Sequence, residues 1–83
     1  MDKTLGYLLE TLSNYSDHHV IPQRMMNKLE NTQYNSEGTF IRELNEEELI
    51  FLNKVLPDEI KYALESQDFK RVQELNEVYE LLP

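Results

Sequence analysis

The sequence predicts an all-α fold: a small bundle of four to five helices that ends in an antiparallel helical hairpin. Two observations lead to this prediction. Apolar residues recur at three- and four-residue intervals along much of the chain, as they do on the buried face of a helix. The longest such pattern, over residues 45–82, is divided by one short polar turn, and a turn this short makes the flanking helices antiparallel.

The chain has 83 residues, a length that suits one domain, expected to span residues 1–83. It contains no cysteine. This composition excludes a thiolate zinc site, a dithiol redox motif and a cysteine nucleophile.

The first helix is expected at about residues 4–15. Asp2 or Thr4 can cap its start, because both side chains accept hydrogen bonds from free backbone N–H groups. Polar residues 13–17 favour an end near there. The apolar stripe of this helix consists of Leu5, Leu8, Leu9, Leu12 and Tyr15.

The second helix is expected at about residues 21–30. Pro22 favours a helix start, since the missing N–H of proline costs nothing at the first helical position. Met25, Met26 and Leu29 continue the apolar face. Residues 31–38 are rich in polar residues and include a glycine, so they predict a loop.

The third helix is expected at about residues 37–43, with Ser36 as its cap. An extended piece at residues 39–41 is the alternative, because threonine, phenylalanine and isoleucine favour strands. A lone strand would have no partner elsewhere in the chain, which favours the helix.

The fourth helix is expected at about residues 46–65. Asn45 and Glu48 have the three-residue spacing of a capping box. Pro57 falls inside the pattern and predicts a kink, because proline removes one backbone hydrogen bond while the apolar phase continues beyond it. The expected buried stripe is Leu49, Leu52, Leu56, Ile60 and Ala63 or Leu64.

The fifth helix is expected at about residues 68–81, capped by Asp68 or Ser66. Lys61–Glu65 and Lys70–Glu74 have the spacing of ion pairs along a helix. The expected buried stripe is Phe69, Val72, Leu75, Tyr79 and Leu82.

The formal net charge of −8 falls mainly on the C-terminal half. This charge argues against a nucleic-acid partner and against anionic membranes, because phosphate groups would be repelled. No stretch approaches the roughly 20 apolar residues of a membrane span. No secretory signal is visible at the start, so a soluble, cytoplasmic protein is expected.

No catalytic, cofactor-binding or metal-binding residues are predicted, and an enzyme is not expected. His18 and His19 are the two histidines, and their adjacent side chains would diverge by about 100° on a helix, which does not favour a shared metal ion. The two glycines are isolated, so no phosphate-binding glycine loop is present.

The five tyrosines and the Met25–Met26 pair admit two interpretations: packing at the rim of the core, or a face that binds a protein. If the first helix does not fully cover the C-terminal hairpin, an apolar patch remains, and such patches often become dimer interfaces. A homodimer is therefore left open.

Five short stretches resemble a known family. They are residues 2–8, which read Asp2-Lys3-Thr4-Leu5-Gly6-Tyr7-Leu8, and residues 12–14, 51–56, 59–63 and 74–82, of which the last is the most specific. The chain is similar along its length to the sigma-G-dependent sporulation-specific acid-soluble spore proteins of endospore-forming bacteria. Pro57 departs from the family pattern. The resemblance implies a protein of sporulation made in the forespore, and brings no catalytic or ligand residues to map.

The function expected from the sequence is therefore that of a small acidic, non-enzymatic sporulation protein acting through protein–protein contacts. A spore structural or storage protein is the alternative. A nucleic-acid binder is a third interpretation, which the net charge opposes.

Overall fold

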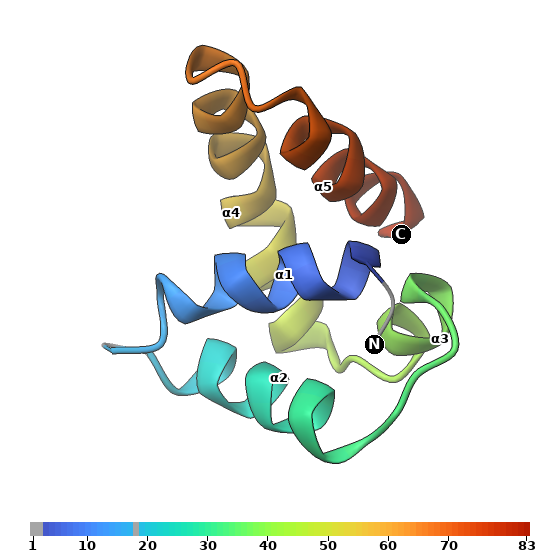
Figure 1. Ribbon diagram of the computed structural model, residues 1–83. Coiled ribbons are helices and arrows are strands. Elements are labelled where there is room, and N and C mark those ends of the chain that lie inside the picture. Colours follow the sequence, from blue (N-terminus) through green and yellow to red (C-terminus); the bar gives the residue numbers. More distant parts are fainter. Residues whose placement is uncertain (1–2, 18) are drawn as a thin grey trace.

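The computed structural model describes residues 3–17 and 19–83. It confirms the all-α prediction: these residues form a bundle of helices with no strand among them. The helices are α1 (Lys3–Ser13), α2 (Val20–Asn31), α3 (Glu37–Arg42), α4 (Glu46–Glu65) and α5 (Phe69–Leu81) (Figure 1). None of the described helices is both long enough and apolar enough to cross a membrane.

The helices α4 and α5 form the antiparallel hairpin, and α1 lies across only its lower part (Figure 1). Helix α2 packs against α1 and α4, and the short α3 packs against α5. The upper part of the hairpin extends beyond the other helices. The helix α4 runs through Pro57 as one helix, and the kink there stays a prediction.

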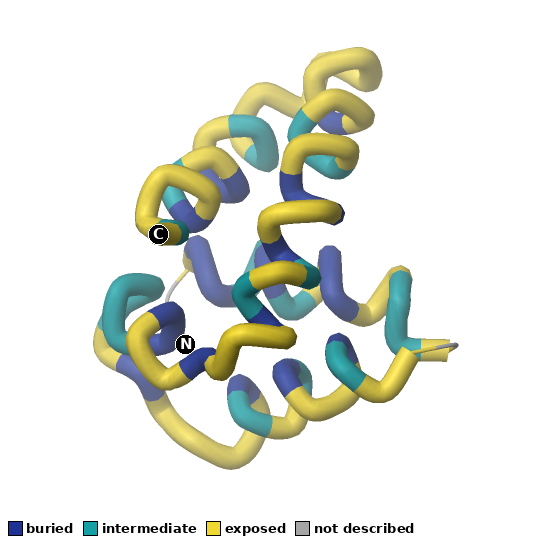
Figure 2. The backbone as a smooth tube through the Cα atoms, turned by 180° about the vertical axis from the view of Figure 1, so that it is seen from behind, coloured by how far each residue is buried: buried dark blue, intermediate teal, exposed yellow. Residues whose placement is uncertain are grey.

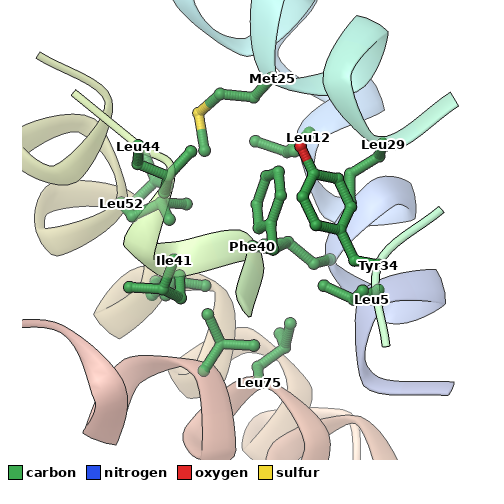
Figure 3. Close-up of a cluster of buried hydrophobic side chains, with 14 residues drawn as sticks. Leu5, Leu12, Met25, Leu29, Tyr34, Phe40, Ile41, Leu44, Leu52 and Leu75 are labelled. Carbon is green, nitrogen blue, oxygen red and sulfur yellow. The ribbon is translucent and has the colours of Figure 1, made fainter. Parts of the chain in front are cut away.

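The core lies where all five helices meet, around the fully buried ring of Phe40 (Figure 3). The ring of Tyr34 meets Phe40 edge-on, with 5.2 Å between the centroids. Each helix contributes apolar side chains with almost no exposed surface, among them Leu5, Leu8, Leu12, Met25, Leu29, Leu52, Leu56, Leu75 and Val78.

The starts of α3 and α5 follow the sequence signals, whereas those of α1 and α2 do not. Thr4, predicted as an alternative cap, is the second residue of α1, because the helix already begins at Lys3. Ser36 caps α3 and accepts a hydrogen bond from the backbone N–H of Thr39. Asp68 caps α5 and accepts from the N–H of Arg71. Pro22 is the third residue of α2 rather than the first. Proline is tolerated there too, because an N–H group at any of the first four positions has no partner within the helix. Asp2 lies outside the described residues.

The start of α4 is held by Glu48, whose side chain is wholly buried. The N–H of Glu48 donates to Asn45 Oδ1, and the N–H of Asn45 donates to Glu48 Oε1, both at 2.9 Å. The same Oε1 accepts from Lys28 Nζ of α2 at 2.7 Å. Lys28 also donates to the backbone carbonyl of Glu43, 3.4 Å away. The carboxylate of Glu48 therefore joins α2 to the start of α4, and Lys28 joins α2 to the end of α3.

The helices α1 and α5 are joined by polar contacts at both ends. Thr4 Oγ1 donates to Glu74 Oε2 at 2.5 Å, and Lys70 Nζ lies 2.9 Å from Glu74 Oε1. The hydrogen bond from Thr4, together with Lys70, holds the pKa of the Glu74 carboxyl below its usual value. Nearer the start of α5, Arg71 pairs with Glu10 of α1 at 2.5 Å and lies over the ring of Tyr7.

Tyr15, which follows the end of α1, anchors this segment on α4. Its hydroxyl donates to Glu59 Oε2 at 3.0 Å, and its ring meets Phe51 edge-on with the centroids 5.8 Å apart. Burial, followed by the hydrogen bond and charge of Glu59, raises the pKa of Tyr15 to about 12.

The turn between α4 and α5 is a Schellman motif. The N–H of Asp68 donates to the carbonyl of Ala63 at 2.8 Å, and that of Gln67 to Leu64 at 3.1 Å. Gln67 has a φ of 59°, the left-handed conformation in which glycine is usually found. The turn is therefore well bonded but strained at one residue.

Replacement of Glu48 by alanine should lower the free energy of unfolding by about 2–3 kcal/mol, because it removes both a cap and a buried partner of Lys28. Lys28 is one-third exposed, so water can partly compensate for its lost partner. Urea denaturation measures the effect. The exposed neighbour Glu47 is the control, and Glu47→Ala should cost about 0.5 kcal/mol or less. Equal losses in the two variants would contradict the role given to Glu48.

Replacement of Gln67 by glycine should raise the free energy of unfolding by about 0.5–1 kcal/mol, because glycine adopts positive φ without steric cost. Thermal unfolding followed by circular dichroism is a suitable measurement. Gln67→Ala keeps the Cβ atom and should give no gain, so stabilisation in that variant would rule out the steric explanation.

The phenolate absorbance of the folded protein should show a tyrosine ionising near pH 12, and Tyr15→Phe should remove this step. The folded pKa of Tyr15 is above the ordinary value of 10, so its hydrogen bond stabilises the fold fully below pH 10. This contribution is lost as the pH rises toward 12. The stability difference between the native protein and Tyr15→Phe should disappear over that range, and a constant difference would contradict the assignment.

Candidate interaction surface

The sequence predicts no metal or catalytic residues, and of the two histidines that it contains the structure describes one. His19 is exposed next to the start of α2, and His18 lies outside the described residues. Within residues 3–17 and 19–83, no group of three or more histidine, cysteine, aspartate or glutamate side chains could hold a metal ion. The prediction of no catalytic or cofactor residues stays a prediction.

The far end of the hairpin, residues 61–70, is its least covered part and is called the hairpin tip here. Ala63 is the one buried residue of this segment, and Figure 2 shows the end of the hairpin almost wholly exposed. Tyr62, Leu64 and Phe69 are 59%, 53% and 62% exposed. Because α1 crosses lower down, these apolar side chains stay exposed, while Tyr62 and Leu64 point to different sides of α4, and an apolar patch that forms a dimer interface stays a prediction.

Two residues of the predicted α5 stripe and one alternative on α4 are therefore corrected. Phe69 and Tyr79 are exposed, whereas Val78 and Glu74 are buried in the α5 interface. Leu64 is exposed while Ala63 is buried, so the first of the two alternatives holds. The physical reason is that α5 is covered from two directions, by α4 and by α1, which rotates its buried face away from Phe69.

One side of α4 carries aromatic rings and carboxylates next to one another. The residues along this side are Phe51, Asp58, Tyr62 and Glu65. Each lies seven, four or three residues after the one before it, and these spacings place side chains on the same side of a helix. Tyr15 packs on Phe51 and donates to Glu59, and the charges of Glu59 and Asp58 both contribute to its raised pKa. We call this set the aromatic–acidic face: Tyr15, Phe51, Asp58, Glu59, Tyr62 and Glu65.

The carboxylates of this face lack the ion pairs that five other described acids form. Glu10, Glu47, Glu48, Asp68 and Glu74 each form an ion pair with a lysine or an arginine. Within the described part of the chain, no ion pair involves Asp58, Glu59 or Glu65. Other described acids, among them Glu30 and Glu77, also form no ion pair, so what distinguishes this face is that Asp58 and Glu65 flank the exposed ring of Tyr62.

Sequence reasoning did not find this face as a unit. Tyr62 and Tyr15 were recognised only as tyrosines with two interpretations, and Glu59 carried no signal. The helical spacing of Asp58, Tyr62 and Glu65 could have indicated it. The contribution of Tyr15 could not be seen, since it depends on how α1 crosses α4, 44 residues further along the chain.

The relatives of the chain agree with the resemblance found in its sequence. The family model described as "CsgA: Minor curli fiber component A" matches residues 1–83. The chain is 52% identical over 82 residues to the "Sigma-G-dependent sporulation-specific SASP protein" of Bacillus subtilis (strain 168), with 99% of each chain covered. No solved structure matches the chain. With a family model matched throughout and a relative half identical over its length, the chain belongs to the CsgA family, that of the sigma-G-dependent sporulation-specific acid-soluble spore proteins.

Proposed function

We propose that this chain acts in the forespore during sporulation, without catalysis, by binding another protein through the aromatic–acidic face. The observation that carries the proposal is the exposure of Tyr62, at 59%, on a helix side whose carboxylates have no ion-pair partners. Tyrosine is enriched among the residues that dominate binding energy at protein interfaces. The sporulation setting comes from the relative's name.

The packed part of the aromatic–acidic face supports this function. Phe51 and Tyr15 are packed and half-buried, and Glu59 is held by the hydroxyl of Tyr15. A binding surface whose side chains are already ordered loses less conformational entropy when a partner binds. The more exposed residues Tyr62 and Asp58 lie next to these packed side chains on α4.

Two other roles receive less support. Nucleic-acid binding would require this chain of net charge −8 to approach phosphates. The description of the family model names a fibre component, and a fibre built from paired strands needs extended segments, whereas the described residues form helices and turns.

A photo-crosslinking amino acid placed at Tyr62 in sporulating cells tests the proposal. We expect one or a few discrete protein adducts from this position. The matched control is the same group at Asn27, an exposed residue of α2 outside the face.

Adducts from Asn27 identical to those from Tyr62 would contradict a specific face. An absence of adducts from Tyr62, combined with an abundance that makes the chain a large fraction of spore protein, would favour the storage role instead.

A further inference from the structure

The aromatic part of the face offers a ring surface to a ligand. Tyr62 is 59% exposed, and its neighbours Tyr15 and Phe51 are half-buried and in edge-to-face contact. The faces of aromatic rings attract cations because of their quadrupole. The chain already contains one such contact, with the guanidinium of Arg71 5.4 Å from the centroid of the Tyr7 ring.

The charged part of the face has three carboxylates that form no ion pair with a described residue. Asp58 and Glu65 lie one helical turn on either side of Tyr62. Lys54 stands one turn before Asp58 and Lys61 adjoins Tyr62, yet neither forms an ion pair with a described residue. With three carboxylates and these two lysines, the side of the helix remains net negative.

The raised pKa of Tyr15 agrees with this local charge. Its largest cause is burial, and Glu59 and Asp58 both add to it. The same negative charges that oppose a phenolate favour a bound cation.

The chemistry of the face selects among partners. A second copy of the chain carries the same net charge of −8 and would be repelled, as would a nucleic acid. A guanidinium stacks on aromatic rings and forms paired hydrogen bonds with carboxylates, whereas an ammonium group is a compact point charge.

We propose, on the basis of the function proposed above, that the aromatic–acidic face binds an arginine-bearing segment of a basic protein, with a guanidinium over Tyr62 and between Asp58 and Glu65. The partner's arginine supplies the ion pairs that these carboxylates do not form with the described residues of the chain.

Titration of the purified chain with a short peptide of alternating arginine and glycine tests this inference. Calorimetry gives the affinity, and amide chemical shifts locate the site. We expect the shifts to concentrate on residues 51–66. The matching lysine peptide should bind more weakly, and a glutamate peptide should not bind.

Two double variants distinguish binding at this face from nonspecific attraction of the peptide to an acidic protein. Asp58→Asn with Glu65→Gln should weaken binding about fivefold, because it removes two contacts of the guanidinium. Glu30→Gln with Glu80→Gln changes the net charge equally on exposed residues outside the face, and should weaken binding about twofold or less. Tyr62→Leu keeps apolar bulk without a ring and should weaken binding about threefold.

The inference would be overturned if the two double variants weakened binding equally. It would also be overturned if the arginine and lysine peptides bound with equal affinity and Tyr62→Leu had no effect. Sedimentation that shows dimerisation through residues 51–66 would also overturn it, by making a second copy the occupant. If one of these results is found while Tyr62 still gives crosslinked adducts in cells, the protein-binding function is retained and the partner has a different chemistry.

Discussion

The buried carboxylate of Glu48 is the interaction on which the arrangement of the helices depends. It completes the capping box of α4 and pairs with Lys28 of α2 at the same oxygen atom. A buried charge is tolerated only when it is paired and hydrogen-bonded. Glu48 meets both conditions at Oε1, whereas its buried Oε2 has no hydrogen-bond partner among the described residues. The contacts of Oε1 place the start of α4 against α2.

Charge is divided between two roles in this acidic protein. Carboxylates near the other helices hold the fold together: Glu48 joins α4 to α2, and Glu74 and Glu10 join α5 and α1. The carboxylates of the aromatic–acidic face have no such structural partner, apart from the hydroxyl that Glu59 accepts. Removing the first group should weaken the fold, whereas the second group forms no ion pair among the residues that the structure describes.

The fold class could be predicted from the sequence because its signals are local. Asn45 and Glu48 are three residues apart, so their capping box is visible in the printed sequence, and the cap at Ser36 is equally local. The partner of Glu48 was not visible, because Lys28 is 20 residues away and exposed acids also favour the first turn of a helix. Phe69 and Tyr79 were wrongly placed in the core, since periodicity gives an apolar stripe but not the directions from which neighbours cover it. The candidate face was missed for the same reason, as Tyr15 reaches it through the crossing of α1.

The incomplete cover of the hairpin has a consequence for the protein's motions. Residues 61–70 contribute one buried side chain, and their hydrogen bonds face solvent on nearly every side. Segments with few buried contacts open in local fluctuations that leave the rest of the fold intact. The amide protons of the hairpin tip therefore exchange with solvent through such openings, while those around Leu52 and Leu75 exchange only when the whole domain unfolds. A partner that binds beside Tyr62 would suppress the local openings and extend the rigid body of the protein to its outermost turn.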